Sequence, residues 1–477
     1  MSLPYNPSDP FSIEIYGQRL VGHSLKDFID INAAGGGGKG YFGSYVEHYF
    51  GIPSNSVSGA DFSTIGGANV ELKTSPLIFL KNGDLRVKER LIFNIINYNN
   101  ICKEQWESST FLNKNKLMLW VAYLYDPNVN PCDYIVQHVR LINLENLPEA
   151  DYAMMKHDWE TIVRYVAGGN AELLSEGLTN YLGACTKGST AAKSMREQPY
   201  SDVPARQRAF SWKQSYLNSV LPFLMEKNPQ PNFAPYLAPS SLCNNNQPSA
   251  FKTSFAPALY ATNTLEQLVE QRFLPYLGKS VSELSAIFNL QISPTAKNYV
   301  AALSKKILGI ADGVEIPEFE KANIAIKTIR LKNDGHMKES MSFKAFKYTE
   351  IIKEEWEMST LKEEWERKFF FVIFQFNEDK TELFLRKVMF WSMPGCDLEN
   401  EVRPVWEKTI QCIKAGQYSS FPKQSESLIC HVRPHGQNNN DRYPTPQGGT
   451  EPKKCFWLNR TYVEDIIDAK CLANTKN

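Results

Sequence analysis

Apolar residues recur along the chain with two different spacings. Between Tyr41 and Phe50 they return every three to four residues, which is typical of one face of an α-helix. Further helices are predicted in four segments: Asp151 to Ala167, Leu173 to Leu182, and the stretches after the Gly-x-Ser turns of LVGHSLKDF and YLGKSVSEL. Short runs rich in β-branched or aromatic residues predict strands at NVELKT, LMLWVAYLY, NIAIKT and FFFVIFQF. The pattern predicts an α/β fold with a central mixed sheet flanked by helices.

The order of these segments occurs twice. Glu89 to Thr110 aligns with Glu339 to Thr360 at an offset of 250, and the two share a Lys-Glu pair, Trp-Glu and Ser-Thr. Other blocks align in the same order at similar offsets: Ala68 to Leu77 on Ala322 to Leu331, Ala209 to Leu221 on Cys455 to Ile467, and more weakly Lys39 to Ile52 on Lys297 to Ile310. Such order and spacing indicate that one domain has been duplicated.

A segment unsuited to a packed element separates the two copies. Between Glu226 and Pro257 the chain is rich in proline, contains an Asn run and has few periodic apolar positions. The 477 residues are therefore divided into a first domain of residues 1–225, a linker of residues 226–257 and a second domain of residues 258–477.

Charge is balanced over the whole chain but not locally. Lys and Arg total 52, as do Asp and Glu, so the net charge alone indicates no partner. Two loop regions are basic: Lys187 to Lys213 has six basic and two acidic residues, and Lys423 to Arg460 has six and three. Positive potential is thus placed on loops expected to meet DNA phosphates. The candidate DNA-contacting residues are Lys187, Arg206, Arg208, Lys213, Arg433 and His435.

Cysteine use and hydropathy indicate the compartment. The nine cysteines form no CxxC pair, which fits a reducing cytoplasm better than a disulfide framework. The N-terminus has no basic segment followed by an apolar one, and the strongest apolar run is far shorter than the ~20 residues of a membrane span. A cytoplasmic protein with no membrane partner is expected.

The clearest candidates for catalytic residues lie on the predicted strand NVELKT, residues 69–74. Residues two apart on a strand face the same side, so Glu71 and Lys73 project together while Leu72 points into the core. Asp61 lies ten residues earlier, and Asp with Glu can hold Mg²⁺ through carboxylate oxygens. Lys73 could then position a water or stabilise the charge of a phosphoryl transition state. These parts suit a Mg²⁺-dependent nuclease.

Other interpretations of these residues remain open. Glu-x-Lys on an exposed strand is also a common ion-pair element. Glu47, on the predicted helix from Tyr41 to Phe50, could join the metal site or be a solvated helix residue, and Lys114 could approach the scissile phosphate or be a surface lysine. The second copy has Ala325 in place of Glu71 and Glu318 in place of Asp61, while Lys327 persists. This asymmetry places the chemistry in the first copy.

Two further motifs carry little weight. The glycine run from Gly35 to Gly38, followed by Lys39, lacks the Gly and the Ser or Thr of a phosphate-binding loop and is expected to be a flexible loop near DNA. His431 and His435 lie in a stretch rich in Pro, Gly and Asn, which argues against a zinc site.

The motifs KGYFGSYVEHYFG, Asp61-Phe62 and Val70-Glu71-Leu72-Lys73-Thr74 resemble those of the MutH-type nucleases, which have the restriction-endonuclease-like PD-(D/E)xK fold. Over nearly the whole chain the sequence is most similar to tandem type II restriction enzymes that cut at GATC. In those enzymes an active MutH-like domain precedes a degenerate one that binds DNA as an effector. The resemblance implies two tandem restriction-endonuclease-like domains, with catalytic roles for Asp61, Glu71 and Lys73 and auxiliary roles for Glu47 and Lys114.

The chain departs from this family at two places. Of the family's base-reading Arg-Pro-Lys loop, only Lys187 is kept in the first copy, whereas the second copy keeps the Arg and Pro of Arg433-Pro434-His435. Extra residues around Gly66 and Gly67 also lengthen the spacing from Asp61 to Glu71.

The function implied is Mg²⁺-dependent cutting of both strands of double-stranded DNA at GATC. A dimer on DNA that loops two sites, and a cognate methyltransferase acting on the same site, are the expected partners. Two rivals stay open: a MutH-like repair enzyme that nicks one strand, and a DNA-binding protein without catalysis.

Overall fold

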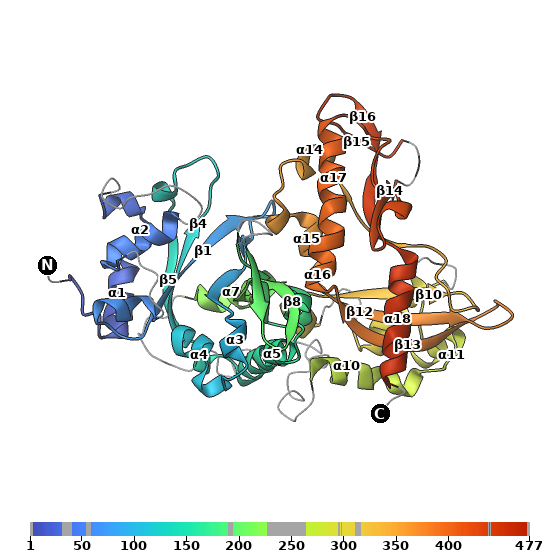
Figure 1. Cartoon of the computed structure of the whole chain (residues 1–477), viewed down its shortest axis with the longest axis horizontal. Helices are drawn as coiled ribbons and strands as arrows, with labels where there is room; N and C mark the ends of the chain where they lie inside the picture. The colour runs from blue at the N-terminus through green and yellow to red at the C-terminus, as the bar shows by residue number, and fades with distance from the viewer. Residues whose placement is uncertain are drawn as a thin grey trace. The chain divides into compact units, whose positions relative to one another are not determined.

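A computed structural model describes residues 3–30, 41–53, 59–188, 194–226, 264–293, 296, 298–310, 316–436, 438 and 440–474. The glycine run with Lys39 and nearly all of the Pro-rich segment lie outside these residues. Figure 1 shows the chain, which divides into two compact units. Unit 1 comprises Met1–Ala171, Thr179–Thr262 and Pro317–Asn323, and unit 2 comprises Glu172–Leu178, Asn263–Ile316 and Ile324–Asn477.

The main sheet of unit 1 has four strands in the order β2-β1-β4-β5. The two central strands are parallel and the outer two run antiparallel to their neighbours. The strands are β1 (Glu71–Phe79), β2 (Leu85–Val87), β4 (Leu117–Leu124) and β5 (Val136–Asn143). Helices α1 (Pro10–Gln18) and α2 (Tyr41–Phe50) share one core with this sheet, through side chains such as Phe50, Leu72 and Val121. The predicted helix at residues 41–50 and the mixed sheet are confirmed.

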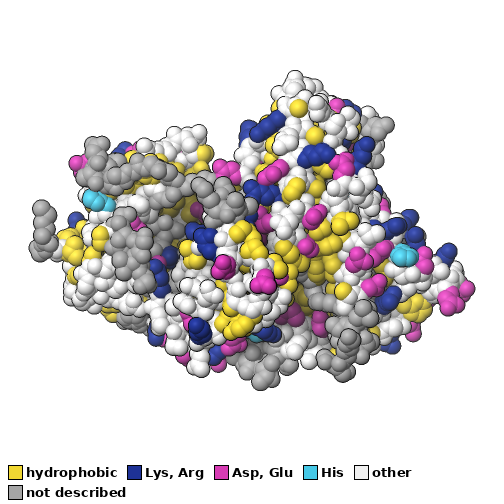
Figure 2. Space-filling view, viewed as in Figure 1, with side chains coloured by type: hydrophobic (Ala, Val, Ile, Leu, Met, Phe, Trp, Pro, Cys, Tyr) yellow, Lys and Arg dark blue, Asp and Glu magenta, His cyan; other side chains and the backbone are white. Residues whose placement is uncertain are grey.

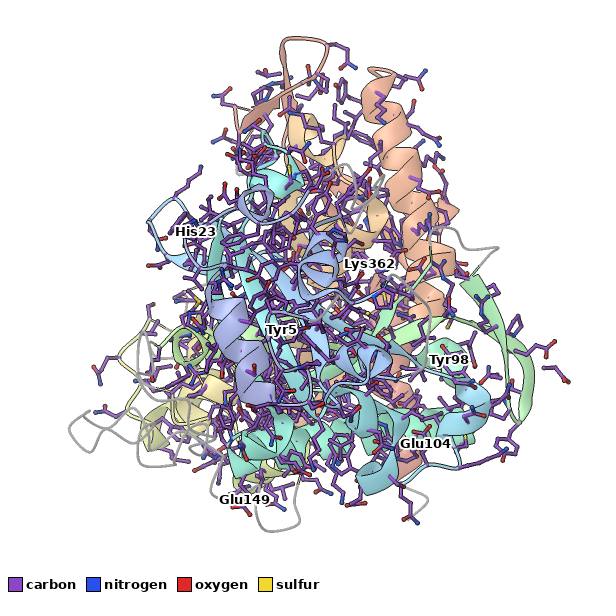
Figure 3. All side chains as sticks on the ribbon, turned by 90° about the vertical axis from the view of Figure 1, so that its left-hand side faces the viewer. Tyr5, His23, Tyr98, Glu104, Glu149 and Lys362 are labelled. Carbon is purple, nitrogen blue, oxygen red and sulfur yellow. The ribbon has the colours of Figure 1, made fainter. Side chains whose placement is uncertain are left out.

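Local contacts fix α2 beside β1. The hydroxyl of Tyr5, labelled in Figure 3, donates a hydrogen bond of 2.7 Å to the backbone oxygen of Phe50 at the end of α2. Gly51 follows with a φ of 71°, a left-handed conformation that favours glycine. The helix that carries Glu47 is therefore held at both its buried face and its C-terminus.

A second sheet of unit 1 carries the basic loop region. Its order is β3-β9-β6, and a two-stranded hairpin, β7-β8, adjoins it along the chain. These strands are β3 (Leu91–Ile95), β6 (Leu182–Thr186), β7 (Met195–Gln198), β8 (Ser201–Arg206) and β9 (Arg208–Trp212). The helices of this part are α3 (Tyr98–Ile101), α4 (Thr110–Asn115), α5 (Glu149–Ala167) and α7 (Gln214–Leu224).

Unit 2 repeats this architecture. A sheet of order β10-β12-β13 has a parallel and an antiparallel pair, and a second sheet has the order β11-β17-β14. The strands are β10 (Ile324–Leu331), β11 (Met341–Phe346), β12 (Lys368–Phe376), β13 (Leu383–Ser392), β14 (Cys430–Pro434), β15 (Arg442–Pro444), β16 (Thr450–Pro452) and β17 (Lys454–Leu458). Its helices include α10 (Leu265–Phe273), α11 (Val281–Ile287), α12 (Tyr299–Ile307), α14 (Tyr348–Ile351), α15 (Thr360–Trp365), α17 (Arg403–Lys414) and α18 (Arg460–Asn474).

The repeat extends to individual hydrogen bonds. Ser109 caps α4 and Ser359 caps α15, each by accepting a backbone N–H three residues later. In both copies a Glu six residues before the Thr accepts the hydrogen bond of the Thr hydroxyl: Glu104 from Thr110, and Glu354 from Thr360. The two copies therefore share the Ser-Thr pair at the start of this helix because its Ser is the N-cap.

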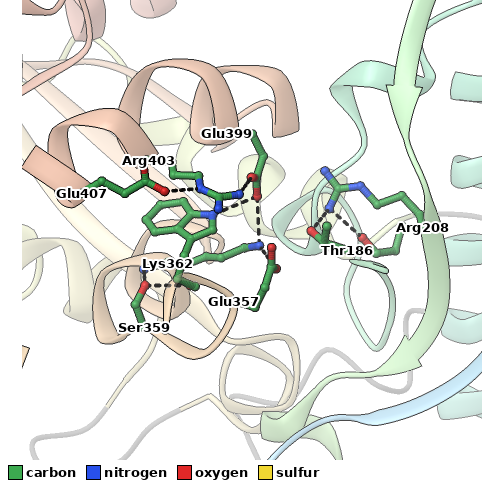
Figure 4. Close-up of polar contacts among 10 residues, drawn as sticks. Thr186, Arg208, Glu357, Ser359, Lys362, Glu399, Arg403 and Glu407 are labelled. Atoms are coloured by element: carbon green, nitrogen blue, oxygen red, sulfur yellow. Dashed lines mark hydrogen bonds and ion pairs between the residues drawn. The ribbon is translucent and has the colours of Figure 1, made fainter. Parts of the chain in front are cut away.

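Unit 2 adds a buried ionic network between α15 and α17. Lys362 on α15 is 1% exposed and donates to Glu399, which also accepts from the indole of Trp356 (Figure 4). Arg403 at the start of α17 reaches the other oxygen of Glu399 at 3.4 Å. Burial of Lys362 is compatible with its charge because carboxylates surround it.

Each unit includes one short segment from the other half of the sequence. Helix α13 (Pro317–Ala322) belongs to unit 1, where Lys321 lies 2.8 Å from both carboxylate oxygens of Asp151. Ser215 on α7 donates to the backbone oxygen of Lys321 at 2.8 Å. In the opposite direction, Glu172–Leu178 belongs to unit 2.

Two predicted helices are wrong. Leu173 to Leu182 begins at the last residue of the 3-10 turn η6 (Ala171–Leu173), contains the 3-10 turn η7 (Glu176–Leu178), and then enters β6. The carboxylate of Asp158 accepts the backbone N–H groups of Asn180, Tyr181 and Leu182, which holds this stretch extended. After the first Gly-x-Ser turn there is only the 3-10 turn η1 (Leu25–Asp27), whereas α11 follows the second.

Among the helices that the described residues form, none is long and apolar enough to cross a lipid bilayer.

We expect unit 1 to lose stability in mild acid because of His138 on β5. Burial, and next the charge of Arg140, lower the pKa of its imidazole to about 4. The unfolded chain takes up a proton near the ordinary pKa of 6.5, so stability falls as pH drops from about 6.5 to 4, by at most about 1 kcal/mol per pH unit. Thermal unfolding at pH 7 and pH 5 should show this slope, and His138→Gln should flatten it. An equal slope in the variant would assign the effect to other groups.

Candidate active site

The strand β1 places Glu71 and Lys73 on one face. The Nζ of Lys73 lies 2.8 Å from Oε1 of Glu71, and the Glu71 side chain is only 4% exposed. Leu72 between them packs into the core shared with α2. The alternation of β1 therefore produces a partly buried carboxylate–ammonium pair.

Asp61 is bound to the same strand. Its Oδ2 accepts the backbone N–H of Leu72 at 2.8 Å, and its own N–H donates to Oε2 of Glu71 at 3.3 Å. Asp61 opens the 3-10 turn η2 (Asp61–Ile65), which ends at Gly66 with a φ of 72°. At Gly67 an added Cβ would lie 2.6 Å from the backbone oxygen of Pro7, so only glycine fits. The extra residues between Asp61 and Glu71 thus form a glycine-dependent turn that keeps both carboxylates together.

Lys114 and Glu47 complete the cluster. The Nζ of Lys114, in the last turn of α4, lies 3.6 Å from Oε1 of Glu71. Glu47 is half-buried on α2; burial, and after it the charges of Asp61 and Glu71, raise the pKa of its carboxyl. The five residues singled out from the sequence therefore come together from four elements: α2, η2, β1 and α4.

The electrostatics suit a divalent cation. Three carboxylates and two ammonium groups meet, and burial together with Asp61 raises the pKa of Glu71 against the opposing effect of Lys73. A cation near Asp61 and Glu71 would relieve this crowding of negative charge. In the part of the chain that the structure describes, no three His, Cys, Asp or Glu side chains are placed so that together they could hold a metal ion, so Glu47 does not form a three-carboxylate site with Asp61 and Glu71. The donor set fits Mg²⁺, which commonly takes one or two carboxylates and keeps several waters.

Two supporting contacts were not anticipated from the sequence. Lys73 lies over the ring of Phe93 on β3, with Nζ 5.9 Å from the ring centroid. Asn115 donates to the side chain of Asn94 at 2.9 Å and so fixes the end of α4 that carries Lys114. Phe93 and Asn94 belong to the repeated block, but the repeat alone does not indicate contact with Lys73 or with α4.

Lys114→Ala should slow DNA cleavage about tenfold. The ammonium contacts Glu71 at 3.6 Å, and loss of one charge-assisted contact costs about 1.5 kcal/mol. Single-turnover cleavage rates measure the effect. Lys116→Ala is the matched control, because Lys116 is an exposed lysine two residues away that pairs with Glu145. Equal rates for the two variants would remove Lys114 from the site.

Three of the predicted DNA-contacting residues are buried. Arg208 is 1% exposed and donates to the hydroxyl of Thr186 and the backbone oxygen of Ala184 (Figure 4). Lys213 is 5% exposed and donates to the backbone oxygens of Thr179 and Ala322. Arg206 is also buried, and its backbone oxygen accepts the hydroxyl of Tyr98, labelled in Figure 3. Their interior positions correct the expectation that these charges are exposed on loops: Arg208 binds strand β6, and Lys213 binds backbone oxygens before β6 and at the end of α13.

The remaining candidates are accessible. Lys187, directly after β6, is partly exposed. Arg433 at the end of β14 lies over the ring of Trp457, with Cζ 3.7 Å from the centroid, and His435 is exposed at the edge of that ring. Basic and acidic side chains are interspersed on the molecular face in Figure 2, in line with the balanced net charge.

Comparisons with known proteins match both copies. A family model described as the DNA mismatch repair enzyme MutH matches residues 50–158 and 311–401, one segment in each half. The first segment contains Asp61, Glu71, Lys73 and Lys114, and the second contains the aligned positions 318, 325, 327 and 364. The match confirms the predicted pair of tandem MutH-like domains.

Individual proteins that are similar to this chain belong to the same family. The type II restriction enzyme Sau3AI of Staphylococcus aureus is 34% identical over 458 residues, which cover 90% of this chain and 88% of that enzyme. The DNA mismatch repair protein MutH of Shewanella woodyi is 28% identical over 137 residues, 29% of this chain and 55% of that protein. MutH of Buchnera aphidicola is 27% identical over 140 residues, 29% and 59% of the two chains. Because the first identity extends over nearly the whole of both chains, the chain belongs to the MutH-like family of type II restriction endonucleases.

Proposed function

We propose that this endonuclease cuts both strands of DNA at GATC in a Mg²⁺-dependent reaction, with its active site at Glu71 and Lys73. The observation that carries the site is the buried Glu71–Lys73 pair tied to Asp61. The choice of GATC and of Mg²⁺ rests on the resemblance to the tandem restriction enzymes and on the oxygen donors present.

Asp61 and Glu71 would hold the metal ion. When bound, Mg²⁺ supplies polarisation of the phosphodiester and acidification of a water. Lys73, held 2.8 Å from Glu71, orients the attacking water and stabilises negative charge on the phosphorus-bound oxygens. Lys114 contributes a second positive charge on the same side of Glu71. Attack of water on phosphorus breaks the bond to the leaving oxygen, and a proton must reach that oxygen.

Catalysis is assigned to residues 1–225, and residues 258–477 bind DNA as an effector. Cutting both strands of a palindrome requires two active sites, so two protein molecules meet on the DNA and can loop two sites. A cognate methyltransferase that modifies the same site would protect the host genome. The partly exposed Arg433 and the exposed His435 on unit 2 are the candidate effector contacts.

Incubation of the purified protein with defined linear DNA and Mg²⁺ tests the activity. We expect discrete double-strand fragments, GATC at every fragment end after sequencing, and no cleavage in EDTA. Singly nicked product would favour the MutH-like repair reaction, and metal-independent binding with no cleavage would favour a DNA-binding protein.

The effector role has its own test. Linear duplexes that carry one or two GATC sites are compared at equal site concentration, and the two-site duplex should be cut faster. Equal rates would contradict the effector role while leaving the cleavage assignment intact.

A further inference from the structure

The counterpart of the active site in unit 2 keeps its framework. Helix α12 ends as α2 does: the N–H of Ile310 donates to the backbone oxygen of Lys305 at 2.9 Å, as Ile52 does to Glu47. Lys327 on β10 lies over Phe343 at 4.6 Å from the ring centroid, as Lys73 lies over Phe93. The positions in unit 2 can therefore be compared with those in unit 1 one by one.

Two of the three carboxylates of unit 1 are replaced at these positions, and the third lies on an element of the other unit. Ala325 replaces Glu71, and the residue aligned with Glu47 is the exposed Lys305. Glu318, aligned with Asp61, lies on α13, which belongs to unit 1. Among the residues that the structure describes, the pair of carboxylates that Asp61 and Glu71 form in unit 1 therefore has no counterpart at the aligned positions beside Lys327.

One carboxylate has appeared elsewhere. Lys114 is the fifth residue of α4, and the fifth residue of α15 is Glu364. Burial raises the pKa of its carboxyl, and the charges of Lys327, Lys344 and Arg367, together with a hydrogen bond from the backbone N–H of Lys344, oppose that rise. Among the described residues, one carboxylate, Glu364, is thus influenced by three cationic side chains, whereas in unit 1 Glu71 lies beside a second acidic residue, Asp61, and two ammonium groups.

This reversal changes which ligand the site favours. Burial lowers the pKa of Lys327, because a partly buried ammonium lacks full solvation, and Glu364 opposes that effect while Arg367 and Lys344 add to it. An anion beside Lys327 would stabilise its charged form. Lys327 is only partly buried and Lys344 is exposed, so a ligand can reach them.

We propose that Lys327, Lys344, Glu364 and Arg367 form a pseudo-site in unit 2 that binds a phosphodiester group of DNA without a metal ion. The proposal deepens the effector role and rests on the proposed function only in taking DNA as the ligand. After the duplication, the position that binds a metal ion in unit 1 has become a position that binds a phosphate in unit 2. Lys327 contributes the central cation, and Glu364 limits the net charge so that free anions are held weakly.

The test measures binding in EDTA with the full chain, so it does not depend on cleavage. A labelled 20-base-pair duplex that contains GATC is titrated, and the number of duplexes bound per protein molecule and each affinity are recorded between about 50 and 200 mM salt. The wild-type protein should bind two duplexes. Lys327→Ala should weaken one of these binding events about fivefold and lower its log–log salt slope by about 0.9, the value for one phosphate contact.

Three further variants separate a phosphate contact from a structural role. Lys327→Arg should keep the affinity, and Glu364→Gln should strengthen binding because it removes negative charge. Ala325→Glu should weaken binding with every lysine retained, which keeps the test valid if Lys327→Ala does not fold. Lys414→Ala, at an exposed lysine at the end of α17, is the control for loss of one charge.

Unchanged affinity and salt slope in both Lys327→Ala and Ala325→Glu would overturn the pseudo-site. Weaker binding by Glu364→Gln would also contradict it, because that result assigns these groups to a structural ion pair. If instead the wild-type protein binds two duplexes but cleaves none in Mg²⁺, the proposed endonuclease activity fails and the pseudo-site stands.

Discussion

Glu71→Gln should abolish cleavage, with a loss of at least about 10²- to 10³-fold in the single-turnover rate. The substitution keeps the shape of the side chain but removes the negative charge that lies 2.8 Å from Lys73 and 3.6 Å from Lys114. Metal affinity and the positions of both ammonium groups depend on that charge. The rate should be measured in Mg²⁺ on a linear GATC duplex, with binding followed in EDTA.

The control for this prediction is Glu145→Gln. Glu145 is an exposed carboxylate paired only at the surface with Lys116 at 2.7 Å, so its neutralisation should leave the rate within about twofold, as is usual for surface ion pairs. DNA binding by Glu71→Gln in EDTA should equal or exceed that of the wild type, since a negative charge has been removed. A cleavage rate of Glu71→Gln within tenfold of the wild-type rate would contradict the assignment of Glu71 as a catalytic residue.

Part of the candidate cluster was predictable because its geometry is local. Alternation along β1 fixes Glu71 and Lys73 on one face, and α2, with its bounds at Tyr41 and Phe50, follows from helical spacing. The link of Asp61 to Leu72 needs only the turn between them. Short-range rules therefore group Asp61, Glu71 and Lys73, whereas the roles of Glu47 and Lys114, which lie on other elements, came from the resemblance; the catalytic roles of all five stay a prediction.

Features that depend on long-range contact were not predictable. The basic composition of their segment predicts that Arg208 and Lys213 are exposed DNA contacts. Instead, both side chains donate hydrogen bonds to backbone oxygens in the interior. The assignment of α13 to unit 1 depends on Lys321 meeting Asp151, a residue 170 positions earlier. No local pattern in the sequence indicates these pairings.

The two units also stabilise the same strand in different ways. In unit 1 the carboxylate of Asp158 on α5 accepts three backbone N–H groups just before and at the start of β6. In unit 2 the equivalent strand β14 is preceded by Ser427, whose hydroxyl accepts the N–H groups of Ile429 and Cys430 at 3.2 and 3.3 Å. The alignment of the repeats does not reveal this exchange of a charged acceptor for a neutral one.

Asp158→Ala should therefore destabilise unit 1 by about 3 kcal/mol or more, because three buried backbone N–H groups lose a charged acceptor. Asp158 is 1% exposed, so water cannot replace the carboxylate without opening the fold. The readouts are the thermal midpoint and hydrogen exchange of the amides of Asn180, Tyr181 and Leu182, which should lose protection first.

Ser427→Ala provides the matched comparison in unit 2. It removes a neutral acceptor of longer hydrogen bonds, so its cost should be about 1 kcal/mol. Because β6 leads directly to Lys187, Asp158→Ala should also weaken DNA binding at temperatures where the folded state still dominates, whereas Ser427→Ala should not alter contacts made by Lys187. If the amides at 180–182 stay protected in Asp158→Ala, packing of β6 against β9 would be sufficient to hold the strand, and the carboxylate would have no structural role there.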